Sequence, residues 1–247
     1  MRGFGMILGA VALLAVLAAG IYGWSLRTNY VAGKLAAVTD PPDLPVGPTP
    51  ASAASMTGAP RILVVGDSRV GQWLDRPQRE GAVFFMRGAG GETSAGGLRR
   101  IQDEMNRFRP DVLLVMTGIN DLVAASLNPE MAVSIERDLV ANLIKMAKAA
   151  AKGGAEPIVA TVIPPADPDW VRRTFFWSDA IWEATRRANA EIMRQAAENG
   201  LRVIDLASAV DAASGPLAVD FSEDTLHWNA AMYARLNEVL VRELFAE

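Results

Sequence analysis

Short apolar runs alternate with longer amphipathic stretches from residue 61 to the end of the chain. Five runs lack the polar alternation of a one-sided strand and predict strands buried on both faces: 62–65, 83–86, 112–117, 158–163 and 202–205. The amphipathic stretches predict helices over 95–107, 129–152, 179–199 and 229–245. This alternation favours a three-layer α/β/α domain, doubly wound around a five-stranded parallel sheet.

The first part of the chain has a different pattern. No charged residue occurs between residues 3 and 26, and residues 4–24 are mostly Ala, Leu, Val, Ile and Gly. About 20 apolar residues cross the ~30 Å hydrocarbon core of a bilayer as a helix. We therefore expect residues 1–34 to form a basic head and one N-terminal transmembrane helix, which anchors the protein in the membrane as an uncleaved signal-anchor.

The orientation of this segment follows from its short basic head. A basic amino terminus before one apolar stretch favours an amino terminus inside and a catalytic body on the extracytoplasmic, periplasmic side. The alternative is a cleaved signal peptide, after which the body would be secreted. The absence of cysteine is compatible with either oxidising location.

A Pro- and Ala-rich stretch separates this segment from the alternating pattern. Proline removes amide donors, and this composition cannot bury a core, so residues 35–60 predict a flexible tether. Residues 61–247 are then the folded domain. The prolines of the stretch are Pro41, Pro42, Pro45, Pro48, Pro50 and Pro60.

Composition excludes several classes of function. The 247 residues include no cysteine and one histidine, His227, so zinc fingers, iron–sulfur clusters and disulfide frameworks are impossible within one chain. We expect no metal and no organic cofactor. With 24 basic and 28 acidic residues, the net charge of −4 gives no broad surface for the phosphates of nucleic acid.

Polar residues follow the predicted strands, where doubly wound sheets bind ligands. Ser68 follows the first strand in Gly-Asp-Ser-Arg, where its hydroxyl can face a ligand or simply cap a helix. Near the end of the chain, Asp224 precedes His227 by three residues, close enough to hold one ring nitrogen while the other faces a nucleophile.

Two further clusters follow the second and third strands. The glycines of residues 88–94 let backbone amides approach an anion, although a plain turn explains them equally and the Lys-Ser/Thr ending of a nucleotide loop is missing. Asn120, in Gly-Ile-Asn-Asp, can donate to a developing oxyanion or form an Asx turn.

The four clusters in this chain order resemble the SGNH subclass of the GDSL esterase/lipase family. The resemblance implies the flavodoxin-like fold of these hydrolases and a Ser-His-Asp triad of Ser68, His227 and Asp224. It also implies an oxyanion hole formed by Ser68, Gly91 and Asn120. Arg69 stands where the family name has leucine, a position that varies, and Met86 replaces an asparagine often found before the second block.

The connection after the fourth strand, residues 164–179, is unusually aromatic and basic and should lie near the site. It predicts a platform for sugar rings with arginines for an anionic polymer, an acyl-chain or lipid contact, or simply a cover for the sheet edge. The candidate substrate-binding residues are Trp170, Arg172, Arg173, Phe175, Phe176 and Trp177.

These features together favour a serine esterase that hydrolyses carboxylic esters through an acyl-enzyme. The expected extracytoplasmic location favours O-acetyl groups on envelope or secreted carbohydrate as the ester. The alternatives are a lysophospholipase or general carboxylesterase, and, from another class, a non-catalytic glycan-binding envelope protein.

Overall fold

Five parallel strands form one sheet in the order β2-β1-β3-β4-β5. This computed structural model describes the backbone of residues 2–46 and 58–245, with side chains from residue 13 onward. The five-stranded parallel sheet confirms the sequence prediction, and its order is the flavodoxin-like one. The strands are β1 (Arg61–Gly66), β2 (Val83–Gly88), β3 (Val112–Met116), β4 (Glu156–Ala160) and β5 (Arg202–Ile204).

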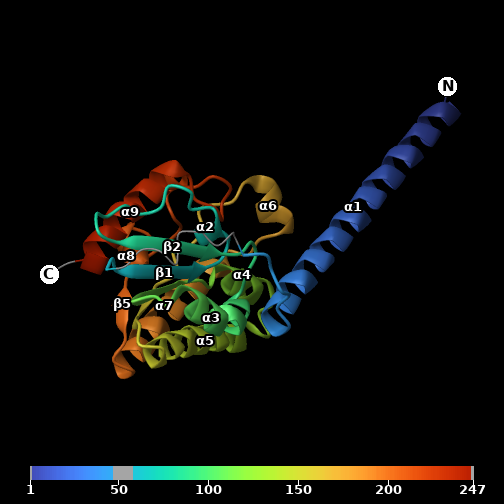
Figure 1. The fold of residues 1–247 in the computed structure, drawn as a ribbon. Coiled ribbons are helices and arrows are strands. Elements are labelled where there is room, and N and C mark those ends of the chain that lie inside the picture. The colour runs from blue at the N-terminus through green and yellow to red at the C-terminus, as the bar shows by residue number, and fades with distance from the viewer. Residues whose placement is uncertain (1, 47–57, 246–247) are drawn as a thin grey trace.

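Helices cover both faces of the sheet and make three layers (Figure 1). One face carries α3 (Ser94–Phe108), α4 (Ile119–Leu127), α5 (Ala132–Lys152) and α7 (Ala180–Glu198). The other carries α2 (Ser68–Gly71), α8 (Leu206–Ala209) and α9 (Ala230–Phe245). The short α6 (Trp170–Phe175) and the 3₁₀ helix η2 (Val219–Phe221) lie in the connections.

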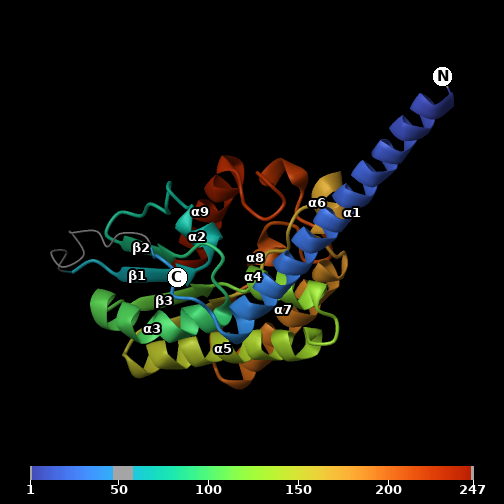
Figure 2. The same ribbon diagram turned by 90° about the vertical axis from the view of Figure 1, so that its right-hand side faces the viewer.

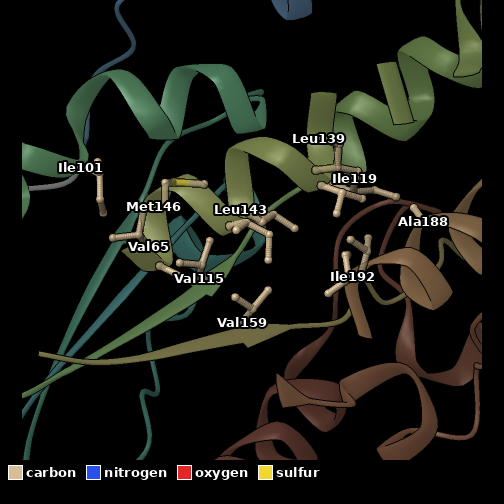
Figure 3. Close-up of a cluster of buried hydrophobic side chains, with 14 of the residues drawn as sticks. Val65, Ile101, Val115, Ile119, Leu139, Leu143, Met146, Val159, Ala188 and Ile192 are labelled. Carbon is tan, nitrogen blue, oxygen red and sulfur yellow. The ribbon is translucent and has the colours of Figure 1, made fainter. Parts of the chain in front are cut away.

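The core has two halves, one on each face of the sheet. Figure 3 shows the first, in which Val65, Val115 and Val159 from three strands face Leu143 and Met146 of α5, all fully buried. On the opposite face the intervening strand residues pack against α9. Because successive strand side chains point to opposite faces, both sets must be apolar, which explains the continuous apolar runs of the sequence.

The end of β4 differs from the prediction. The strand ends at Ala160 and not at Ile163, because the side chain of Asn189 on α7 takes over the pairing. Its amide accepts from the backbone nitrogen of Val162 and donates to the carbonyl oxygen of the same residue, both at 2.8 Å. The chain therefore leaves the sheet earlier, although the residues stay buried.

A long helix, α1 (Arg2–Thr39), precedes the domain and projects from it (Figures 1 and 2). Among the described residues, no helix is long and apolar enough to cross a membrane, so the transmembrane helix expected over residues 4–24 is not supported. The side chains of residues 1–12, the first part of that expected span, lie outside the described residues.

The helix continues through residues 35–39, where the sequence predicted the start of a tether. Leu35 and Val38 pack against Ala124, Ala125 and Ile135 of α4 and α5. The final turns of α1 are therefore part of the folded body. Residues 47–57 of the expected tether lie outside the described residues.

Candidate active site

The point where the strand order reverses, between β1 and β3, is where doubly wound sheets bind ligands. Ser68 stands there, half-buried, directly after β1 and at the start of α2. The carboxylate of Asp67 caps this short helix by accepting a hydrogen bond from the amide of Arg69 at 2.9 Å. The cap fixes the turn and holds the Ser68 hydroxyl above the sheet edge.

His227 lies within hydrogen-bond reach of this serine although the two are far apart in sequence. Its Nε2 is 3.0 Å from Oγ of Ser68. On the other side of the ring, Nδ1 is 2.9 and 3.0 Å from the two carboxylate oxygens of Asp224. The structure thus brings together the three residues predicted as a triad, in the linear order acid, imidazole, hydroxyl.

The charge of Asp224 decides which ring nitrogen carries the proton. Partial burial raises the pKa of Asp224, but hydrogen bonds from the backbone and ring of His227 and from the amide of Leu226 together lower it further, below its ordinary value. The carboxylate is therefore ionised at neutral pH and accepts from Nδ1–H, which leaves Nε2 of neutral His227 free to accept the Ser68 proton.

Arg69 holds the loop that carries His227. Its guanidinium is buried and donates to the carbonyl oxygens of Leu226, at 2.7 Å, and Ile163, at 2.6 Å. It also lies over the ring of Trp228, 4.8 Å from the centroid. Burial lowers the pKa of Arg69 to about 10, so it stays charged at neutral pH. The residue next to the nucleophile thus ties the histidine loop to the chain after β4.

The predicted oxyanion residues come from the two neighbouring loops. Asn120 begins α4 and is buried, and its Nδ2 donates to the carbonyl oxygen of Glu92 at 3.0 Å. Gly91, one residue earlier in that loop, has φ of 76°, a conformation that glycine adopts without strain. Asn120 therefore lies next to the loop of Gly91.

Asp121 joins these two loops. Its carboxylate accepts from the amide of Ser94 at 2.9 Å and from the Ser94 hydroxyl at 2.6 Å, at the start of α3. Burial raises the pKa of Asp121 to about 6, against the lowering effect of the Ser94 hydrogen bonds. The sequence analysis did not single out Asp121, although it directly follows Asn120.

The aromatic and basic connection divides into residues that pack and residues that remain available. Trp177 is 7% exposed and packs against Trp182, so it belongs to the core. Arg173 forms ion pairs with Asp167 and Asp179.

The other aromatic residues of the connection divide in the same way. Phe175 and Phe176 contact α1, whereas Trp170 is 75% exposed. Of the six candidates, only Trp170 and Arg172 have side chains without such partners among the described residues.

Lys34 is a residue at this site that the sequence analysis missed. It lies on α1 and donates from Nζ to Oδ1 of Asn120 at 3.2 Å. Its sequence signal was weak, because it follows an apolar segment expected to lie in the membrane. Only the return of α1 to the domain brings it to the strand ends.

Comparisons with known proteins agree with this geometry. The model of the GDSL-like lipase/acylhydrolase family matches residues 52–235. No curated protein matches the sequence. Among solved structures, a lipase/acylhydrolase from Enterococcus faecalis is 26% identical, with 75% of this chain and 95% of that chain covered at a TM-score of 0.56.

Two further solved structures share the fold. A GDSL-like lipase from Bacteroides thetaiotaomicron is 20% identical, with 78% of this chain and 93% of that chain covered at a TM-score of 0.61. An acetyl xylan esterase is 16% identical, with 75% of this chain and 100% of that chain covered at a TM-score of 0.56.

The buried carboxyl of Asp121 gives a direct test of the local electrostatics. We predict that it titrates near pH 6, well above the ordinary value of 3.8, because burial disfavours its charged form. The measurement is NMR of its carboxyl carbon, assigned with the Asp121→Asn variant. Ser94→Ala removes a hydrogen bond to the ionised form and should raise the midpoint further. A midpoint below about 4 would contradict the buried environment.

Proposed function

The chain belongs to the GDSL-like lipase/acylhydrolase family and is an ester-bond hydrolase, and from this premise we propose that Ser68 is its nucleophile. His227 is the proposed general base, and Asp224 orients its ring and stabilises the imidazolium. The observation that carries the proposal is the pair of contacts on the imidazole, 3.0 Å from Nε2 to Oγ of Ser68 and 2.9 Å from Nδ1 to Asp224.

The proposed reaction has two stages. In the first, the Ser68 oxygen attacks the ester carbonyl while its proton moves to Nε2 of His227, and the alcohol then leaves with that proton. In the second, His227 activates a water that attacks the acyl-enzyme and releases the acid. Ser68 regains its proton from His227, so the enzyme returns to its starting state.

Negative charge develops on the carbonyl oxygen in both stages. The proposed donors to this oxygen are the amides of Ser68 and Gly91 and the side-chain Nδ2 of Asn120. Each comes from a different loop at the strand ends, and Asp121 ties two of these loops together through Ser94. The hole is therefore held in place before the substrate arrives.

For the substrate, we propose O-acetyl groups on envelope or secreted carbohydrate. The exposed Trp170 offers a flat apolar surface of the kind on which sugar rings stack. A similar fold is that of an acetyl xylan esterase. Lysophospholipid or general carboxylester hydrolysis and a non-catalytic glycan-binding role are the competing outcomes of the tests below.

The acyl preference tests this substrate class. We expect the full-length protein to hydrolyse p-nitrophenyl acetate at least about tenfold faster than the octanoate, because a site for acetyl has no room for the added methylenes. Ser68→Ala should abolish both activities. A preference for octanoate would favour the lipid reading, and no Ser68-dependent turnover of any ester would favour the binding module.

The role of Asn120 is tested by Asn120→Ala. The expected fall in kcat is about 10²- to 10³-fold, which is the usual effect of losing one oxyanion donor. Asn128→Ala is the matched control, because Asn128 is buried at the other end of α4 and donates to the carbonyl oxygen of Ala124. Wild-type kcat in Asn120→Ala, or an equal loss in the control, would refute the role.

For location, we propose that residues 1–34 anchor the protein with its catalytic domain on the extracytoplasmic side. Support comes from the uncharged stretch between residues 3 and 26. After cell fractionation, the full-length protein should stay with membranes through an alkaline carbonate wash and should be digested by protease added outside the cytoplasmic membrane. Recovery in the cytosolic fraction would contradict this, and recovery of a shortened soluble form would indicate signal cleavage.

A further inference from the structure

The last turns of α1 bring an additional charged side chain to the strand ends. Tyr30 on α1 packs edge-on against Phe176, with ring centroids 5.1 Å apart. One turn earlier, the guanidinium of Arg27 donates to the carbonyl oxygen of Phe175 at 2.9 Å. These contacts fix α1 against the connection that contains α6. Residues 27–34 precede the part of the chain that matches the family model, which begins at residue 52.

Lys34 is held at this junction with donors to spare. Its ammonium spends one hydrogen bond on Oδ1 of Asn120, at 3.2 Å, and lies 5.6 Å from the ring centroid of Tyr30. An ammonium group has three N–H donors. Among the described residues Lys34 has no ion-pair partner, and it is half-buried.

A second cation faces the same place. Arg172 on α6 also lacks an ion-pair partner among the residues that the structure describes, whereas the adjacent Arg173 has Asp167 and Asp179. The charge of Arg172 is felt by Lys34. Burial lowers the pKa of Lys34, Arg172 lowers it further, and only the carboxylate of Asp67 opposes them.

Holding two like charges together in a partly buried place is unfavourable without a counter-charge. The nearest acid acting on Lys34 is Asp67, which is itself engaged in capping α2. An anion bound between the two cations would remove the repulsion and use the free donors. The arrangement is therefore incomplete in the protein alone and is completed by a negatively charged ligand.

We propose that Lys34 and Arg172 form an anion-binding subsite beside Ser68, so that the preferred ester carries a carboxylate or phosphate on its alcohol half. This inference rests on the proposed function and narrows its substrate to the acetyl ester of an acidic carbohydrate. The subsite binds the charge while the acetyl group reaches the nucleophile. Specificity then comes from α1 and α6, outside the catalytic loops.

Lys34 has a second effect, through Asn120. An ammonium can only donate, so it fixes Oδ1 of Asn120 toward itself and turns Nδ2 toward the loop of Gly91. Lys34 is thus a positioning residue for the proposed oxyanion donor. Loss of Lys34 should lower kcat for every ester and raise KM for anionic esters, whereas loss of Arg172 should act on KM for anionic esters alone.

The test compares three acetyl esters on the full-length protein: an acetylated methyl glucoside, the matching methyl glucuronoside and the matching sugar phosphate. We expect wild-type kcat/KM to favour an anionic ester over the neutral one by about tenfold or more, the effect of a charge-assisted hydrogen bond. Arg172→Met and Lys34→Met should reduce this ratio toward one, and Lys34→Arg should keep most of it.

The matched control is Lys148→Met, which removes a charge from an exposed lysine on α5 and should leave the ratio unchanged. Preference for the glucuronoside identifies a carboxylate ligand, and preference for the sugar phosphate identifies a phosphate; each supports the subsite. An equal ratio in wild type and in the Arg172→Met and Lys34→Met variants would overturn it.

A binding measurement separates this proposal from the proposed esterase function. Calorimetry of unacetylated methyl glucuronoside and glucose phosphate with Ser68→Ala protein needs no catalysis. We expect one of them to bind, and adding Arg172→Met should weaken that binding about tenfold. Binding without ester turnover in the wild type would refute the esterase and keep the subsite. Turnover without Arg172-dependent binding would do the reverse.

Discussion

The site depends on how closely the chain packs at the carboxyl end of β1. A Cβ atom on Gly66 would lie 2.2 Å from the carbonyl oxygen of Met116, and one on Gly88 would lie 2.1 Å from the amide nitrogen of Gly71. Both distances are far below contact, so only glycine fits at either position. This close packing sets α2 directly against the ends of β1 and β2, with Ser68 at its start.

The other loops are fixed relative to that point by buried polar contacts. Arg69 connects the nucleophile turn to the histidine loop and to the chain after β4, through the carbonyl oxygens of Leu226 and Ile163. Asp121 connects the loops of Asn120 and Gly91. Because buried polar groups are costly when unpaired, each contact favours a single arrangement of the loops. The geometry around Ser68 is thus part of the fold.

Much of the fold could be predicted because its strands are buried on both faces and read as uninterrupted apolar runs. β4 was predicted too long, since the apolar run continues to Ile163 while pairing passes to the side chain of Asn189. α4 was not predicted, because its Gly-Ile-Asn-Asp start resembles a turn. The docking of α1 was not predicted either, since its contacts form with α4, α5 and α6.

The same limit applies to the site. The proximity of Ser68 and His227 followed from the order of motifs along a doubly wound sheet. Lys34 and Arg69 could not be found in that way, because their positions depend on contacts made by chain segments distant in sequence. Their charges matter only after α1 and the histidine loop have packed, which sequence spacing does not reveal.

The central claim is that His227 activates Ser68, and covalent labelling tests it most directly. The full-length protein would be treated with diisopropyl fluorophosphate, and the adduct would be located by mass spectrometry of its peptides. The account predicts one adduct per chain, on Ser68, and strongly reduced labelling in His227→Ala. An adduct on another serine, or equal labelling of Ser68 without His227, would contradict it.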